Sequence, residues 1–192
     1  QGSDDECRTP LFVASDFGYL DVVQTLLQVQ GIDPNKATQN DDEYRDGRAP
    51  LYVAAQNGHV EVVRALLKAP GIDANQPAAS DGATPLFIAC CYGHLDVVRV
   101  LLQLQGIEVN KARTDDGTTP LLIASEYGYL DVIQLLLQAE GIDVNQASTD
   151  DGMVPLYIAC QEGFLDVVQA LLQIDGIEVN KAKTDSGATS LF

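Results

Sequence analysis

Apolar residues recur along the chain with the period of one helix face. In the third of several similar segments they stand at i, i+3, i+6 and i+7: Leu95, Val98, Leu101 and Leu102. Val97 widens this apolar side, as in a helix packed between two neighbours. Asp96 falls in the first turn, where the helix dipole favours a negative charge. The same order of residues returns at 165–172, so the pattern predicts a short amphipathic helix that recurs.

A second short helix is predicted directly before each of these. It opens with Thr-Pro-Leu, as at 84–86 and 119–121, where Thr is a good N-cap and Pro suits the first helical position. Glycine ends this helix, and a second glycine, at Gly106 or Gly141, ends the next one. The remaining stretch, such as 142–152, closes on an Asp-Gly turn and predicts a hairpin-like finger.

The glycines show that this unit is repeated. Of the sixteen, all but Gly2 fall into three series, whose members are Gly18, Gly58, Gly93, Gly128 and Gly163, then Gly31, Gly71, Gly106, Gly141 and Gly176, then Gly47, Gly82, Gly117, Gly152 and Gly187. The spacing is 35 residues, with one step of 40 between the first two units. Such a period indicates stacked units, each too small to bury its apolar side alone.

Two helices and a finger, opened by T-P-L and closed by G-I-D-V-N, resemble the ankyrin repeat. The resemblance implies an all-α repeat solenoid of stacked helix-turn-helix units with projecting β-hairpin-like fingers. We expect a single domain over 4–192, and we interpret residues 1–3 as the remnant of a cleaved tag. The units are expected to begin near Thr9, Ala49, Thr84, Thr119 and Val154, with a partial sixth at Thr189.

The sequence departs from the family pattern in two respects. The His that normally follows T-P-L is replaced by Phe12, Tyr52, Phe87, Leu122 and Tyr157, so packing must take the place of the family's imidazole hydrogen bonds. Ala49 and Val154 stand where a capping Thr is expected. Each is expected to weaken its helix start by about 0.5–2 kcal/mol.

The charge balance narrows the classes of partner. Twenty-eight acidic and eleven basic residues give a net charge of −17, which argues against binding to nucleic acid or to anionic membranes. No apolar run is long enough to span a membrane. The four cysteines form no CxxC pair, which fits a reducing intracellular compartment, cytoplasmic or nuclear.

Candidates for chemistry are few. His59 and His94 occupy a slot that Tyr or Phe fills in other units, which indicates a scaffold role. Cys90 and Cys160 share a small-residue slot about 20 Å apart, too far for a disulfide, and Cys91 is the thiol expected at the surface.

The sequence supports neither a metal site nor a catalytic site. Zinc binding by Cys90, Cys91 and His94 lacks a fourth ligand. The recurring finger acids, Asp115, Asp116, Asp150, Asp151 and Asp185, lack the spacing of a calcium loop and are interpreted as solvated turn residues. No catalytic motif is present in the sequence, and we expect neither enzyme activity nor a cofactor.

The resemblance implies protein–protein interaction through a concave groove lined by the first helices and the fingers. The expected contact residues precede the first glycine of each unit or its helix cap, or lie in the five-residue insertion of the first finger: Arg8, Asp16, Phe17, Tyr44, Arg45, Arg48, Gln56, Asn57, Cys91, Tyr92, Thr118, Glu126, Tyr127, Met153, Gln161 and Glu162. Phe17, Tyr92, Tyr127 and Met153 are expected to be exposed apolar groups, a composition typical of interfaces.

Two functions remain open. The first is a binding module for a protein or peptide with a basic face and apolar anchors, since the acidic surface would attract such a partner. The second is a structural spacer or intramolecular scaffold, which the near-identity of 106–112 and 176–182 favours. We also expect the native chain to continue with further repeats, and the C-terminal unit to fray or to self-associate.

Overall fold

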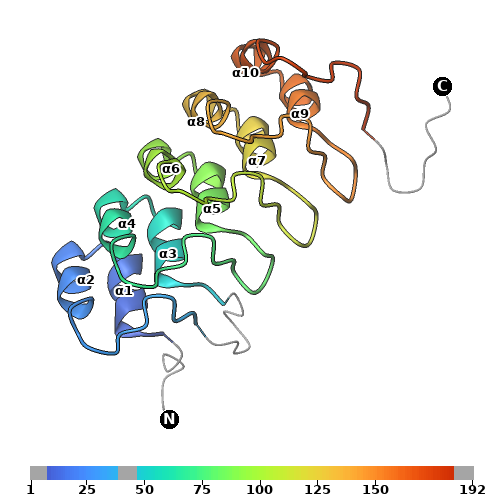
Figure 1. Cartoon of the computed structure of the whole chain (residues 1–192). Helices are drawn as coiled ribbons and strands as arrows, with labels where there is room; N and C mark the ends of the chain where they lie inside the picture. Colours follow the sequence, from blue (N-terminus) through green and yellow to red (C-terminus); the bar gives the residue numbers. More distant parts are fainter. Residues whose placement is uncertain (1–7, 39–46, 184–192) are drawn as a thin grey trace.

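The computed structural model describes residues 8–38 and 47–183, and in them ten helices form five consecutive pairs (Figure 1). The helices are α1 (Pro10–Asp16), α2 (Leu20–Leu26), α3 (Pro50–Gln56), α4 (Val60–Leu66), α5 (Pro85–Cys91), α6 (Leu95–Leu102), α7 (Pro120–Glu126), α8 (Leu130–Leu136), α9 (Pro155–Glu162) and α10 (Leu165–Leu171). The structure confirms the predicted all-α repeat solenoid. The partial sixth unit at Thr189 and the insertion residues Tyr44 and Arg45 lie outside the described residues.

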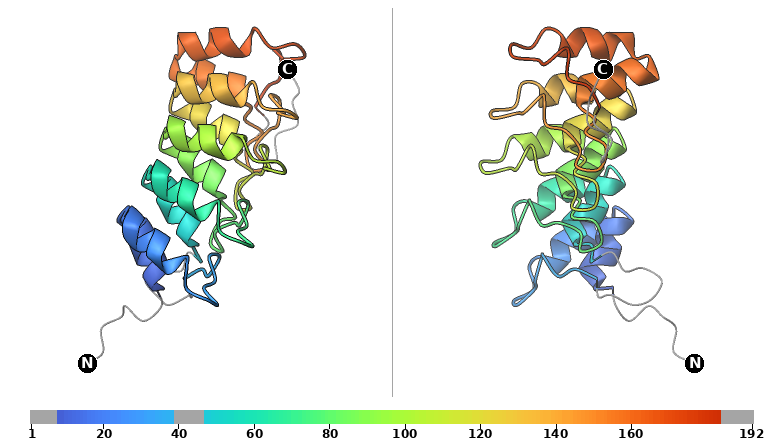
Figure 2. Two further views of the ribbon diagram at one scale, coloured as in Figure 1. Left: turned by 60° about the vertical axis from the view of Figure 1, so that its left-hand side comes forward. Right: turned by 90° about the vertical axis from the view of Figure 1, so that its right-hand side faces the viewer.

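The helices lie in two rows. Odd-numbered helices contact one another in the order α1, α3, α5, α7 and α9, and even-numbered helices do the same in a second row. The loops that follow the even-numbered helices project from the stack as fingers, all toward the same side (Figures 1 and 2). Each repeat therefore presents the same face to the next repeat.

The helix starts follow from the capping residues. The hydroxyl oxygens of Thr84 and Thr119 accept hydrogen bonds from the backbone N–H of Phe87 and Leu122, each at 3.2 Å. Thr9 caps α1 in the same way. As predicted, Ala49 and Val154 make no such bond at the starts of α3 and α9.

In the first four repeats, glycine follows the first helix for two reasons. At Gly93 the backbone has φ of +68°, a conformation that side chains disfavour. A Cβ atom there would also lie 2.9 Å from Cε1 of Tyr129, whose ring covers the glycine from the next repeat. The glycine thus permits both the turn and the close approach of neighbouring repeats.

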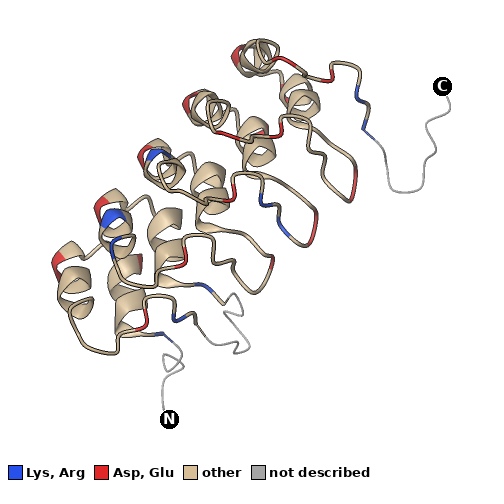
Figure 3. Ribbon diagram, in the orientation of Figure 1, with Lys and Arg blue, Asp and Glu red and all other residues tan. Residues whose placement is uncertain are grey.

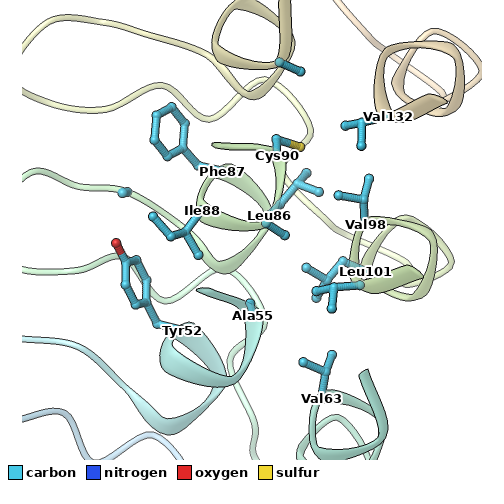
Figure 4. Packing of buried hydrophobic residues seen from close by; sticks show 14 of the residues in the cluster. Tyr52, Ala55, Val63, Leu86, Phe87, Ile88, Cys90, Val98, Leu101 and Val132 are labelled. Carbon is cyan, nitrogen blue, oxygen red and sulfur yellow. The ribbon is translucent and has the colours of Figure 1, made fainter. Parts of the chain in front are cut away.

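The core lies between the two rows and between successive repeats (Figure 4). Leu86 of α5 and Val98 and Leu101 of α6 are fully buried there. Ala55 and Cys90 occupy the small-residue slot and are also fully buried, as the sequence predicts. This arrangement buries the apolar side of each helix pair against its neighbours.

The exposed thiol of the described residues is not the one that the sequence predicts. Cys160 occupies the small-residue slot of α9 but is exposed, because no described helix packs on that side of α9. Cys91, the thiol expected at the surface, is only half-buried, and burial raises the pKa of its thiol. Cys160 is therefore the exposed thiol among the described residues.

The fingers are closed by backbone hydrogen bonds, although no strand is formed in the described parts of the chain. The N–H of Ala78 donates to the carbonyl of Ala83 at 2.8 Å, and the N–H of Arg113 donates to that of Thr118 at 3.0 Å. Neighbouring fingers are also joined, since the N–H of Thr114 donates to the carbonyl of Asp81 at 2.7 Å. The fingers are hairpin-like and are held in register with one another.

Asparagine side chains bind each repeat to the next. The Nδ2 atom of Asn75 donates to the carbonyl of Gly106 at 2.8 Å, and its Oδ1 accepts from the N–H of Glu108 at 3.0 Å. Equivalent pairs of bonds are made by Asn35, Asn110 and Asn145. The four residues form an asparagine ladder along the stack.

Candidate protein-binding surface

Three aromatic rings stand exposed at the ends of odd-numbered helices. Phe17, Tyr92 and Tyr127 are the C-cap residues of α1, α5 and α7 and are 60%, 51% and 50% exposed. Each ring stacks on another two residues along the chain: Phe17 on Tyr19 with centroids 5.7 Å apart, Tyr92 on His94 at 6.1 Å, and Tyr127 on Tyr129 at 5.9 Å. The sequence prediction that these three rings are exposed is confirmed.

In the second, third and fourth repeats, the residue before the C-cap of the first helix lies close to a finger. In the second repeat, Oε1 of Gln56 accepts a hydrogen bond from Arg48 at the base of a finger, at 3.1 Å. In the third and fourth, Cys91 is influenced by the charge of Arg113, and Glu126 by the charges of two finger aspartates. The helix ends and the finger bases therefore bound a common surface, called the inner face below.

Asp16 and Asn57 join neighbouring repeats at this surface. The side-chain amide of Asn57 donates to both the carbonyl oxygen and Oδ1 of Asp16, each at 2.9 Å. The Nε2 atom of His59 lies 3.0 Å from the same carbonyl oxygen, and His94 makes the equivalent contact with the carbonyl of Gln56 at 2.9 Å. The interpretation of both histidines as scaffold residues agrees with these contacts.

Arginine side chains lie over three of the rings that replace the family's histidine. The guanidinium of Arg8 lies 5.7 Å from the ring centroid of Phe12, and that of Arg48 lies 5.5 Å from that of Tyr52. Arg113 lies 5.7 Å from the ring of Phe87. Such cation–π contacts provide the packing that the missing imidazoles required.

Arg113 was not predicted as a site residue. It forms ion pairs with Asp115, Asp116 and Asp81, with the shortest contact to Asp115. Hydrogen bonding and charge from Arg113 hold the pKa of Asp115 below its usual value against the effect of burial. The sequence offers one weak indication of this role. The position of Arg113 is uncharged in the first, second and fourth repeats, where it is Thr38, Ala78 and Ser148, and is basic again in the fifth, where it is Lys183.

Two predicted contact residues are less accessible than expected. Thr118 is buried, and its backbone N–H donates to Oδ1 of Asp116 at 2.8 Å. Met153 is half-buried, with its N–H bonded to Oγ of Ser148 at 2.8 Å. Both lie on the returning arm of a finger, where closure of the turn draws the residue inward.

Carboxylates gather at the C-terminal part of the inner face. Glu126 is exposed at the end of α7, yet its pKa is raised by partial loss of hydration and then by the negative charges of Glu162, Asp116 and Asp151. Gln161 and Glu162 are exposed at the end of α9. The pKa of Tyr127 is raised as well, by the charge of Cys91 first, then by burial and by Glu126. The raised pKa values of Glu126 and Tyr127 show that nearby negative charge disfavours ionisation of both side chains.

The charges are unevenly placed over the whole fold. Acidic residues recur on the even-numbered helices and on the fingers, whereas basic residues are few (Figure 3). Within 8–38 and 47–183, no group of three or more His, Cys, Asp or Glu residues could hold a metal ion. No helix in these ranges is long and apolar enough to cross a membrane.

The sequence matches the family model described as ankyrin repeats (3 copies) over residues 11–113 and 103–183. The match spans most of the chain, which therefore belongs to the ankyrin repeat family. No curated protein gives a significant match to the sequence. Ankyrin repeats generally mediate protein–protein interaction and are typically non-enzymatic, which fits the exposed aromatic row and the repeated scaffold.

Proposed function

We propose that this chain is a non-catalytic binding module that holds a protein or peptide against its inner face. The observation that carries the proposal is the row of exposed rings formed by Phe17, Tyr92 and Tyr127. Aromatic side chains of this kind are enriched at protein interfaces and supply much of their binding energy. They also lose little conformational entropy on binding, since stacking already restricts each ring.

The partner's chemistry follows from charge. The chain carries a net charge of −17, and Glu126 and Glu162 place carboxylates beside the aromatic row. A basic partner would be attracted to this surface and would relieve the mutual repulsion of the carboxylates. We therefore propose a partner with a basic face and one or two apolar anchors.

The charged residues at the two ends of the inner face favour one orientation of a bound partner. Arg8 and Arg48 lie just before α1 and α3, toward the N-terminal end, whereas Glu126 and Glu162 lie at the ends of α7 and α9, toward the C-terminal end. An extended partner would bind with its acidic part near the arginines and its basic part near the glutamates. Opposite charges at the two ends would disfavour the reversed orientation.

Selection from a random peptide library displayed on phage tests the proposal and requires no identified partner. Wild-type protein should enrich peptides that combine Lys or Arg with an aromatic or aliphatic residue. The Tyr92→Ala/Tyr127→Ala variant should bind the selected peptides at least about tenfold more weakly, since each anchor contributes more than 1 kcal/mol at a typical hot spot.

Gln103→Ala provides the matched control. Gln103 is exposed at the C-cap of α6 and lies in the even-numbered row, away from the aromatic rings. This variant should bind the selected peptides as tightly as the wild type. Equal binding by the Tyr92→Ala/Tyr127→Ala variant would contradict the proposal.

A structural spacer is the second candidate, and the asparagine ladder favours it. The same two hydrogen bonds recur from Asn35 to Asn145, which gives a stack of uniform geometry. A spacer requires no exposed anchors, so peptide selection should then enrich no common motif. The library experiment therefore distinguishes the two functions.

A further inference from the structure

The first repeat exposes apolar residues that the other four repeats bury. Val22 of α2 is 47% exposed, whereas its counterparts in the even-numbered helices are buried: Val62, Val97, Val132 and Val167. Val13 of α1 is also exposed, while its counterparts Val53, Ile88, Ile123 and Ile158 are buried. The preceding repeat supplies this burial within the stack. We call the exposed surface of Val13, Tyr19 and Val22 the leading face.

The fifth repeat exposes the opposite side of the same interface. Leu165 of α10 is 68% exposed, whereas Leu20, Val60, Leu95 and Leu130 at its position are partly buried against the core. Cys160 is exposed where Ser15, Ala55, Cys90 and Ser125 are fully buried. The following repeat supplies this burial within the stack. We call the exposed surface of Cys160, Gly163 and Leu165 the trailing face.

The two faces match in a specific contact as well as in apolar character. Within the stack, a ring from each repeat covers the helix-ending glycine of the repeat before it: His59 on Gly18, His94 on Gly58, Tyr129 on Gly93 and Phe164 on Gly128. At Gly163 a Cβ atom would have no described atom within 4 Å. Tyr19, the equivalent ring of the first repeat, is 55% exposed. Tyr19 therefore has the place and shape to cover Gly163 of another molecule.

The asparagine ladder also has complementary ends. Asn180 holds the position of the four ladder residues and is exposed, with no described repeat after it. Gly31 holds the position of the glycines whose carbonyls accept from the ladder, and it is exposed as well. Stacking of the two faces would extend the ladder by one step, from Asn180 to the carbonyl of Gly31 and the N–H of Asp33.

We propose that two copies of this chain associate head to tail, with the leading face of one on the trailing face of the other. The established contact between successive repeats is the template, because each face offers the residues that the other buries inside the stack. Such an interface is heterologous and leaves one free face at each end, so association continues into longer assemblies at high concentration. The negative charge of both copies opposes it, and salt should strengthen it.

Sedimentation velocity on two complementary variants tests the proposal. Val22→Glu places a carboxylate on the leading face, and Leu165→Glu places one on the trailing face. Wild-type protein should increase in mass with concentration, and each variant alone should remain monomeric, with a dissociation constant raised at least about tenfold by the buried charge. An equimolar mixture should form a 1:1 dimer, since it contains one intact leading face and one intact trailing face.

Gln103→Glu adds the same charge to an exposed position of the central repeat and should associate like the wild type. Circular dichroism confirms that each variant retains its helices. Wild-type protein that stays monomeric up to millimolar concentration would overturn the proposal. Dimerisation of either variant alone would also overturn it, because it would show pairing of two identical faces.

Discussion

The side chain of Asn75 makes two hydrogen bonds to the backbone near Gly106 in the next repeat, one of them to the carbonyl of Gly106 itself at 2.8 Å. The amide group satisfies a backbone acceptor and a backbone donor together, so it fixes both the spacing and the rotation of one repeat on another. Its recurrence along the stack explains why the G-I-D-V-N segment ends in asparagine.

Replacement of a ladder residue should destabilise the stack. Asn110→Ala removes bonds of 2.7 Å to the carbonyl of Gly141 and 2.9 Å to the N–H of Asp143. We expect the free energy of unfolding in urea to fall by about 1–2 kcal/mol, from two neutral hydrogen bonds at a half-buried site. Asn180→Ala is the control, since no described repeat follows it, and an equal loss there would contradict the explanation.

The capping residues predict a reciprocal pair of effects. Thr119→Val removes the hydroxyl that accepts from the N–H of Leu122 and should cost about 0.5–2 kcal/mol. Val154→Thr puts a side chain of nearly the same shape, but with a capping hydroxyl, at the start of α9. This variant should stabilise the protein by up to about 1 kcal/mol. Thermal unfolding measures both. Equal melting temperatures for the two variants would show that capping does not govern these helix starts.

The crowding of carboxylates predicts a pH-dependent effect at Glu126. Its pKa is raised in the folded state, so the charged carboxylate opposes folding above that pKa, and the cost disappears as the pH falls through it. Glu126→Gln should therefore raise the melting temperature modestly at pH 7 and leave it unchanged at pH 3.5, below the ordinary pKa of glutamate. Glu61→Gln, at an exposed site on α4, should show no such gain.

Thiol labelling should follow burial. In a Cys7→Ser background, Cys160 should react first because it is exposed. Cys91 should react more slowly, since it is half-buried and burial raises its pKa, which lowers the fraction of reactive thiolate. Cys90 is fully buried, its pKa is raised further, and it should react only on unfolding. Mass spectrometry of labelled peptides gives the order, and early labelling of Cys90 would contradict the packing between α5 and its neighbours.

The association rate of a basic peptide should depend on salt. Between about 50 and 300 mM salt the Debye length falls from roughly 14 to 6 Å, which screens attraction to the acidic surface. We expect the association rate to fall several-fold, with little change in the dissociation rate. Stopped-flow fluorescence measures both. A constant association rate would show that the acidity of the chain does not steer its partner.

The sequence determined the repeat, its helices and the aromatic row. Thr-Pro-Leu, the glycines and the apolar spacing act within a few residues of one another, so their effects do not depend on distant contacts. The exposure of Phe17, Tyr92 and Tyr127 was also predictable, because each stands at the end of a helix whose apolar side is used elsewhere.

Only the tertiary structure decided how equivalent positions differ between repeats. Cys90 and Cys160 share one slot, yet one is buried and the other exposed, because a neighbouring repeat covers the first alone. Closure of the fingers drew Thr118 inward, and Arg113 of the third finger came to lie over Phe87 of the same repeat. A repeated sequence specifies the same local structure each time, whereas burial and charge at a position depend on what packs against it.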